Sequence, residues 1–173
     1  MKKELWVMCG IPGSGKSTWL SKHAPLSSVV VSRDRIRFAL INNGEDYFSK
    51  EDDVFNEYIR WIQDELNDED CLGPVIADAT QMTRGSRKKL LDRLNLSNVS
   101  SIHCFQFDVS LETCIERNEQ RSGLSYVPKS VIRRMFYQQE KANFTEGNYT
   151  FTLHNIDENG VERSVGRVDL DHI

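Results

Sequence analysis

The sequence predicts an α/β fold with a mainly parallel sheet and helices on both faces. Short apolar runs alternate with amphipathic segments along most of the chain, and parallel neighbours need helical crossovers of this kind. The length of 173 residues suits one domain with a buried core. A glycine-rich segment between the first apolar run and the first amphipathic one also fits a strand-to-helix turn.

The apolar runs are read as strands because they are short, rich in β-branched or aromatic residues and bounded by turn signals. The last two runs flank a four-residue turn that contains Asn159-Gly160, so they predict a β-hairpin at the C-terminal end. That hairpin either completes the sheet edge or meets a partner. The predicted strands are 5–9, 28–32, 74–78, 101–107, 148–156 and 161–168.

The amphipathic segments are read as helices from their 3.6-residue period and their end signals. Thr83 and Ser110 are good N-caps, Pro25 ends the first helix, and Asn43-Gly44 ends the second. The predicted helices are 18–24, 34–42, 49–67, 83–95, 110–121 and 128–142.

The glycine-rich segment matches the P-loop pattern G-x-x-x-x-G-K-[ST] at every fixed position. In such a loop, backbone N–H groups hold phosphate oxygens, the lysine reaches the outer phosphates and the serine hydroxyl binds Mg²⁺. We therefore expect ATP and Mg²⁺ as cofactors, bound by this P-loop. The predicted nucleotide-binding residues are Gly10, Gly13, Ser14, Gly15, Lys16, Ser17 and Thr18, with Ser17 also on the metal.

The composition favours a cytoplasmic protein without a membrane segment. The chain is 39% hydrophobic and 28% charged, and it has no apolar run long enough to cross a bilayer. Met1-Lys2-Lys3 leads directly into the first strand, which is not the pattern of a signal peptide. The cysteines lack zinc-site spacing, so we read them as reduced, small hydrophobic residues: Cys9, Cys71, Cys104 and Cys114.

The charge is unevenly distributed, although the net charge is only −4. Residues 45–70 hold eleven acidic side chains against Lys50 and Arg60, so the remainder is net positive. The basic clusters are either phosphate-backbone contacts or ordinary solvated helix faces. They comprise Arg84, Arg87, Lys88, Lys89 and Arg93, and then Lys129, Arg133 and Arg134.

Two carboxylates follow predicted strands, where open α/β sheets bind their ligands. Asp34 is placed to accept a proton from an attacking hydroxyl, and Arg37 lies one helical turn later on the same face. Asp78 ends a buried strand, which is typical of an acid that orients the Mg²⁺ shell. The alternatives are a helix-start acid for Asp34, a surface position for Arg37 and a turn acid for Asp78.

Two arginines four residues apart, Arg117 and Arg121, lie on one face of a predicted helix before a glycine-containing loop. This arrangement is typical of a lid that brings guanidinium groups onto a transferring phosphoryl group. A solvated helix end is the competing interpretation.

These motifs together resemble the 5′-hydroxyl polynucleotide kinase domain of phage and bacterial nucleic-acid repair enzymes. The resemblance covers about residues 4–142 and rests on the P-loop, S-R-D-x-x-R, V-I-x-D-A-T, the R-N-x-x-R segment and V-P-x-x-V-I-x-R-M. It implies a P-loop NTPase fold with strand order 2-3-1-4-5. We divide the chain into a P-loop kinase domain, residues 1–147, and a C-terminal β-hairpin extension, residues 148–173, packed on the same domain.

The resemblance also implies roles. Lys16, Asp34 and Arg121 are the implied catalytic residues, with Asp34 as the general base. Arg37 matches an arginine that contacts a phosphate of the acceptor strand, and Arg117 lies beside the lid arginine on the donor phosphates. The implied substrate is a 5′-hydroxyl end of DNA or RNA.

One position departs from the pattern, because Gln81 stands where relatives often carry asparagine. Two other functions stay open: a small-molecule P-loop kinase of the nucleotide-sugar or antibiotic type, and a nucleotide-binding module without an acceptor. A basic groove on the acceptor side would favour nucleic acid, and a closed pocket would favour a small molecule. The sequence does not indicate an oligomeric state.

Overall fold

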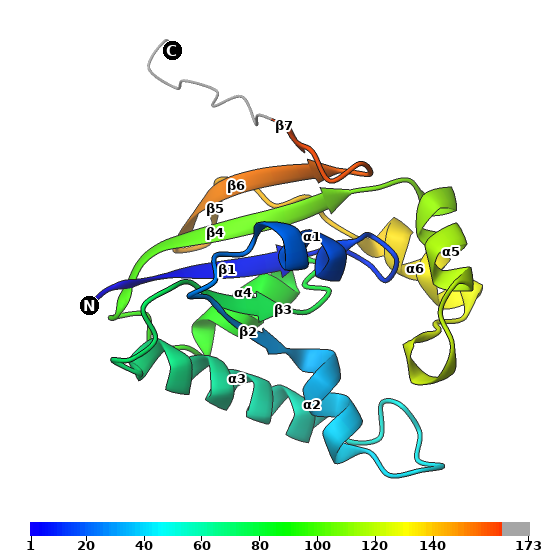
Figure 1. Cartoon of the computed structure of the whole chain (residues 1–173), viewed down its shortest axis with the longest axis horizontal. Coiled ribbons are helices and arrows are strands. Elements are labelled where there is room, and N and C mark those ends of the chain that lie inside the picture. The colour runs from blue at the N-terminus through cyan, green and yellow to red at the C-terminus, as the bar shows by residue number, and fades with distance from the viewer. Residues whose placement is uncertain (164–173) are drawn as a thin grey trace.

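A computed structural model describes residues 1–163, and the chain folds around one twisted sheet (Figure 1). In the described part the strand order is β2-β3-β1-β4-β6-β5, and β7 pairs with β6 outside this path. The strands are β1 (Lys3–Cys9), β2 (Val29–Ser32), β3 (Val75–Asp78), β4 (Val99–Asp108), β5 (Thr145–Glu146), β6 (Tyr149–Asp157) and β7 (Glu162–Arg163).

The helices occupy the segments between these strands, as the alternating pattern predicted. They are α1 (Lys16–His23), α2 (Arg33–Leu40), α3 (Glu51–Asn67), α4 (Arg84–Asp92), α5 (Leu111–Glu119) and α6 (Lys129–Gln138), with a short 3₁₀ turn, η1 (Gly123–Ser125). Within residues 1–163, no helix is both long and apolar enough to span a bilayer.

The predicted strand order is confirmed, with β6 in the fifth place. Strands β3 and β4 flank β1 in parallel, and β6 runs parallel to β4. The predicted tail strand therefore completes the sheet, and β7 returns antiparallel beside it. Part of the second predicted tail strand, residues 164–168, lies outside the described residues.

Helix α6 ends at Gln138, four residues before the predicted end, because the chain turns extended at Gln139. The extended segment after α6 forms backbone hydrogen bonds with residues of other parts of the chain. The Glu140 N–H donates to the Met82 carbonyl at 2.7 Å, and the Ala142 N–H donates to the Gln106 side chain at 2.7 Å.

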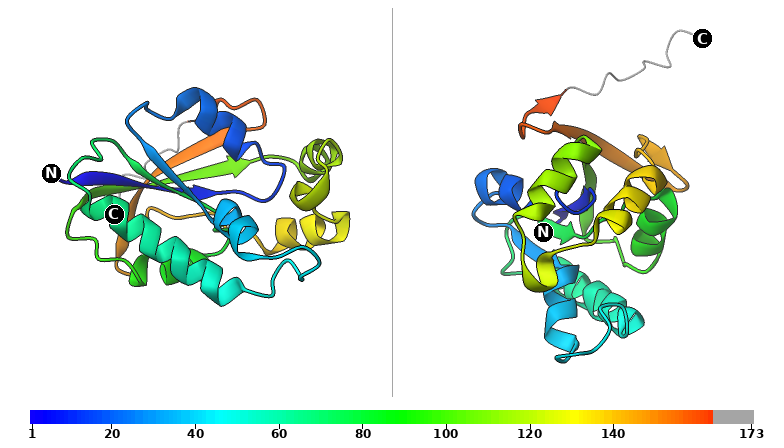
Figure 2. Two further views of the ribbon diagram at one scale, coloured as in Figure 1. Left: turned by 60° about the horizontal axis from the view of Figure 1, so that its bottom comes forward. Right: turned by 90° about the vertical axis from the view of Figure 1, so that its right-hand side faces the viewer.

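Side chains alternate between the two faces of the sheet, so each face carries its own core. Leu5 and Val7 of β1 pack in a cluster that includes α3 and α4. Met8 of β1 and Phe105 of β4 pack in a second cluster that includes Trp19 of α1. Figure 2 shows α1 and α3 on opposite sides of the sheet, as the fold class requires.

One member of the predicted basic clusters is not at the surface. Arg87 is 1% exposed and makes a two-bond ion pair with Glu146, which is 7% exposed, at 2.7 and 2.8 Å. Its remaining guanidinium nitrogen donates to the carbonyls of Gln81 and Glu140. Arg87 therefore joins α4 to β5 and to the segment after α6, and its assignment to a solvent-facing basic patch was wrong.

We expect Glu146→Gln to destabilise the fold by about 3–5 kcal/mol, because it leaves a buried guanidinium without its counter-charge. Urea denaturation of both proteins measures the difference. The matched control is Lys88→Ala, which removes an exposed pair with Asp92 and should cost under about 1 kcal/mol. A loss below about 1 kcal/mol for Glu146→Gln would contradict the role given to this pair.

Candidate active site

The predicted site residues meet at the carboxyl edge of the sheet. The P-loop follows β1, Asp34 lies in the first turn after β2, and Asp78 ends β3. Register brings them together, because Met8 of β1 and Ser32 of β2 both lie opposite Asp78. Figure 1 shows α5 and α6 beyond this same edge of the sheet.

The P-loop needs glycine at two positions for its backbone shape. Gly13 and Gly15 have φ of 84° and 91°, in the left-handed region that other residues rarely adopt. Gly13 also lies directly on α5, since a Cβ there would stand 2.3 Å from the carbonyl oxygen of Cys114. The shape of the loop therefore depends on the conformations of its glycines and on the close contact of Gly13 with α5.

The loop is suited to hold an anion. The hydroxyl of Ser14 is buried and has no hydrogen-bond partner among the described residues. Helix α1 begins directly after Gly15 without a side-chain cap or an acidic residue in its first turn, so its N-terminal N–H groups and dipole favour negative charge. Phosphate oxygens of a nucleotide satisfy both requirements.

Lys16 is the first residue of α1, and its ammonium group donates back to the Gly10 carbonyl of the loop at 2.6 Å. Burial lowers the pKa of its ammonium group, while the carboxylates of Asp78 and Asp34 act in the opposite direction and Arg121 adds to the lowering. Asp78, Asp34 and Arg121 are thus each close enough to Lys16 to influence its charge. A bound polyphosphate supplies the negative charge that favours the charged form of Lys16.

Asp78 and Ser17 fit the needs of Mg²⁺. Burial raises the pKa of the Asp78 carboxyl, and the neighbouring Lys16 partly offsets the rise. Within the described residues, no cluster of three or more histidine, cysteine, aspartate or glutamate side chains forms a complete metal site. Mg²⁺ takes one or two protein oxygens together with substrate phosphates and water, and Ser17 and Asp78 are the protein oxygens predicted for it here.

Asp34 stands at the start of α2 with its side chain 64% exposed. One carboxylate oxygen, Oδ1, accepts hydrogen bonds from the Arg37 guanidinium and from the Tyr47 hydroxyl. The site therefore presents an oriented carboxylate that solvent and substrates can reach.

Arg37 is only 5% exposed, and its donors are already engaged. Nε and Nη2 donate to Glu51, and Nη1 donates to Asp34 and Tyr47. A contact between Arg37 and an acceptor phosphate would require exchange of these partners, and it stays a prediction.

The two lid arginines differ in position. Arg117 lies on the P-loop, where its guanidinium donates to the Gly13 carbonyl at 3.4 Å and to the Glu158 carbonyl at 2.6 Å. Arg121 follows the end of α5 and is exposed, near enough to Lys16 to oppose its charge. Arg117 is therefore bound to the P-loop, whereas Arg121 is exposed, and the approach of either arginine to a nucleotide stays a prediction.

The sequence reasoning missed several residues that shape this site. Asn118 is fully buried and ties the base of the lid by donating to the Val127 carbonyl at 2.7 Å and accepting from its N–H at 3.0 Å. In the sequence Gln81 is only a departure from the pattern; in the structure it takes a left-handed φ of 42° and donates to the Tyr58 hydroxyl. Glu51 and Tyr47 lie in an acidic segment with no motif of its own, so only their contacts reveal them.

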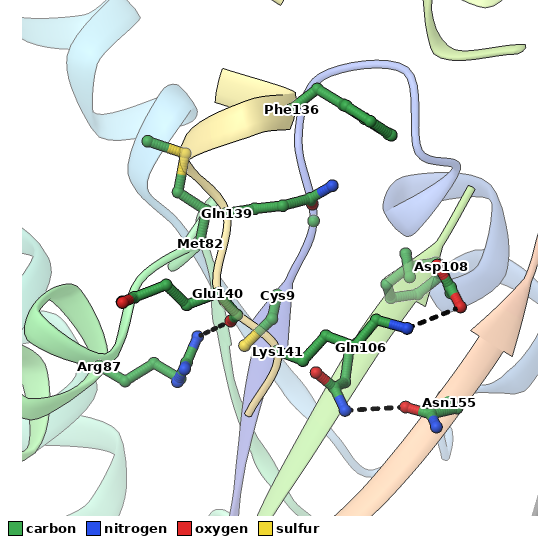
Figure 3. A pocket seen from close by; sticks show the side chains of 12 residues that line it. Cys9, Met82, Arg87, Gln106, Asp108, Phe136, Gln139, Glu140, Lys141 and Asn155 are labelled. Atoms are coloured by element: carbon green, nitrogen blue, oxygen red, sulfur yellow. Dashed lines mark hydrogen bonds and ion pairs between the residues drawn. The ribbon is translucent and has the colours of Figure 1, made fainter. Parts of the chain in front are cut away.

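A cavity of about 270 Å³ lies beside the site and is drawn in Figure 3. It touches Gly10 at the base of the P-loop, but neither Lys16 nor Asp34 lines it. Several of its polar groups are paired with one another, since Lys141 donates to Asp108 and Gln106 donates to Asn155. The predicted catalytic residues Lys16 and Asp34 therefore lie outside the lining of this cavity.

Comparison with known proteins bears on the same elements. Residues 5–143 match the AAA domain family, a span that runs from β1 to the segment after α6. The chain belongs to this family. Within it, the predicted resemblance to a polynucleotide kinase domain is confirmed. A protein of Autographa californica nuclear polyhedrosis virus, named for polynucleotide kinase and RNA ligase functions, is 27% identical over 82% of this chain and 21% of its own length.

Solved structures support the fold of this AAA domain. A chain of the Pnkp1/Rnl/Hen1 RNA repair complex has a TM-score of 0.66 and 23% identity, over 83% of this chain and 47% of its own. A fungal RNA kinase has a TM-score of 0.57 and 14% identity, over 91% and 74%. A sugar kinase from Janibacter sp. HTCC2649 has a TM-score of 0.53 and 16% identity, over 92% and 87%.

This chain covers only part of these relatives, which limits the conclusions that can be applied to it. This chain spans about a fifth of the viral protein and about half of the repair-complex chain. The match does not extend to the other parts of those proteins. Their activities as whole proteins therefore do not transfer with the fold.

We expect Gly13→Ala to abolish measurable ATP binding, because the new methyl group meets a backbone carbonyl that cannot move without shifting α5. Isothermal titration calorimetry with ATP and Mg²⁺ measures this. Gly147→Ala is the matched control, since Gly147 also has a positive φ, of 61°, but open space around its Cβ position. If both variants bind ATP like the parent protein, the proposed nucleotide site is wrong.

Proposed function

We propose that this chain is an ATP-dependent kinase that transfers the γ-phosphate to the 5′-hydroxyl end of DNA or RNA. The observation that carries the proposal is the exposed, oriented carboxylate of Asp34 at the sheet edge that also holds the P-loop lysine. Asp34 is close enough to Lys16 and Asp78 to influence the pKa of each. This proximity supports a mechanism in which Asp34 accepts a proton beside the nucleotide that the P-loop would hold.

The reaction is an in-line displacement at phosphorus. The acceptor hydroxyl oxygen forms a bond to the γ-phosphorus, the bond from that phosphorus to the bridging oxygen of ADP breaks, and the hydroxyl proton passes to Asp34. Lys16 and Arg121 stabilise the charge that develops on the transferring group, because preorganised cations favour the transition state. Mg²⁺, held by Ser17 and Asp78 together with phosphate oxygens, would neutralise part of the same charge.

The nucleic-acid acceptor is supported by the relatives named for polynucleotide kinase and RNA kinase functions. The exposed position of Asp34 also suits a polymer end, which cannot enter a closed pocket. The acidic segment 45–70 repels phosphates, so we expect the strand to leave the site away from α3. Exposed cations on α6, Arg133 and Arg134, offer phosphate contacts.

A small-molecule kinase is the second candidate. The sugar kinase that shares the fold supports it, and so does the acidic surface near α3, which suits a cationic acceptor better than a polyanion. A nucleotide-binding module without an acceptor is the third candidate. The oriented carboxylate of Asp34 argues against it, because such a module needs no base at this position.

The test is phosphate transfer from γ-labelled ATP with Mg²⁺ to paired oligonucleotides that carry a 5′-hydroxyl or a 5′-phosphate. Only the hydroxyl end should be labelled, and the apparent KM for it should rise with salt as phosphate contacts weaken. Transfer to a sugar, a nucleoside or an antibiotic but to no 5′-hydroxyl end would replace the proposal with the second candidate. ATP binding without transfer to any acceptor would leave the third.

We expect Asp34→Asn to lower kcat by roughly 10²–10⁴ while the affinity for ATP is largely kept, because it removes the proton acceptor and little else. Initial rates at saturating ATP measure the change. Asp64→Asn, an exposed carboxylate on α3, is the matched control and should leave kcat within about twofold. A near-normal kcat for Asp34→Asn would remove the base from the mechanism.

Arg121 is expected to act on the transferring phosphate through two parallel hydrogen bonds. Arg121→Lys keeps the charge but not the forked geometry, so it should stay impaired by roughly tenfold or more in kcat. The change is measured from initial rates beside Arg121→Ala and the exposed α3 control Arg60→Lys. Full kcat in both Arg121 variants would show that the lid contributes nothing to transfer.

A further inference from the structure

Tyr47 is tied to Asp34, although it lies in the loop between α2 and α3, outside every motif. Its hydroxyl donates to Asp34 Oδ1 at 3.0 Å and accepts from Arg37 Nη1 at 3.1 Å. The Tyr47 ring also covers the Arg37 guanidinium at 4.6 Å and packs edge-on against Phe48 at 4.8 Å. The ring is thus held on two sides, and its hydroxyl has a defined direction.

The two oxygens of Asp34 are treated unequally. Oδ1 accepts from both Tyr47 and Arg37, whereas no donor among the described residues bonds to Oδ2. A carboxylate can turn about its Cβ–Cγ bond, so one anchored oxygen determines where the other points. The pair of donors on Oδ1 therefore leaves Oδ2 as the oxygen that an incoming hydroxyl can reach.

We propose that Tyr47 is a positioning residue for the catalytic base, and that it acts by anchoring Oδ1 of Asp34 so that Oδ2 receives the proton of the acceptor hydroxyl. The inference rests on the proposed function to the extent that Asp34 is the base. It holds for any hydroxyl acceptor, because it concerns the carboxylate and not the rest of the substrate.

The chemistry of Tyr47 suits this task. Burial, together with the negative charge of Asp34, raises the pKa of the Tyr47 hydroxyl to about 12, so it remains a donor at neutral pH. Arg37 supplies the other donor to this oxygen, and Glu51 binds its Nε and Nη2 and so determines where the guanidinium lies. Tyr47 approaches the same oxygen from a different segment and supplies a second direction.

The experiment compares Tyr47→Phe with the parent protein in steady-state transfer from ATP. We expect kcat to fall by about tenfold, as for a reacting group held in the wrong orientation, with the KM for ATP unchanged within about twofold. Tyr137→Phe is the matched control, since Tyr137 is 78% exposed and its hydroxyl has no hydrogen bond among the described residues. Its kcat should equal that of the parent.

A double-mutant cycle separates positioning from a structural effect. In an Asp34→Asn background, Tyr47→Phe should lower kcat by less than about twofold, because the group it serves is already gone. A structural loss would instead persist in that background and would lower the thermal unfolding midpoint. An unchanged kcat in Tyr47→Phe, or an equal loss in both backgrounds, overturns the inference.

Failure of the role proposed for Tyr47 can be distinguished from failure of the proposed function. If the parent protein phosphorylates a small hydroxyl compound but no 5′-hydroxyl end, the nucleic-acid proposal fails and the same cycle is run with that compound. If the parent transfers to no acceptor of either class, the base assignment and the role of Tyr47 fail together.

Discussion

The parallel register of the three strands β2, β3 and β1 is the constraint on which the site depends. In a parallel sheet all carboxyl ends lie at one edge, so a residue after each strand contributes to one shared surface. Ser32 and Met8 both lie opposite Asp78, which brings the segments after β2 and β1 to either side of it. A change of one position would move each of these side chains to the other face of the sheet.

Charge balance at that edge is the second level of organisation. Burial disfavours the charged forms of both Lys16 and Asp78, and the charge of each residue favours the charged form of the other. The P-loop adds the Ser14 hydroxyl, which has no partner among the described residues, and a helix end without a side-chain cap, and both suit a bound anion. Leaving these groups without partners costs stability, and a bound nucleotide would supply the partners. The buried Arg87–Glu146 pair, by contrast, has its hydrogen bonds and a structural role.

The acceptor side is organised differently. Here the donors of Arg37 and Tyr47 are directed at one oxygen of an exposed carboxylate, and Glu51 holds Arg37 in place. The result is a carboxylate with one anchored oxygen, in a side chain that stays exposed to solvent. An acceptor contributed by a polymer end or by a small molecule would meet the same carboxylate, which is why the fold shared with RNA kinases and a sugar kinase does not by itself choose between them.

The sequence by itself determined the features that depend on local spacing. The alternation of apolar runs and amphipathic segments specified the α/β class, and Gly13, Gly15, Lys16 and Ser17 specified the phosphate loop, because these properties follow from residues close together in the chain. Tertiary structure decided what depends on distant partners. Arg87 looks like a surface cation in the sequence, and only the structure shows Glu146, fifty-nine positions away, bound to it. Likewise, only the structure shows that Glu51 binds the Arg37 guanidinium, whose contact with an acceptor phosphate stays a prediction. Tyr47 carries no signal in its own segment, because its significance comes only from the carboxylate that the α2–α3 loop brings to its hydroxyl.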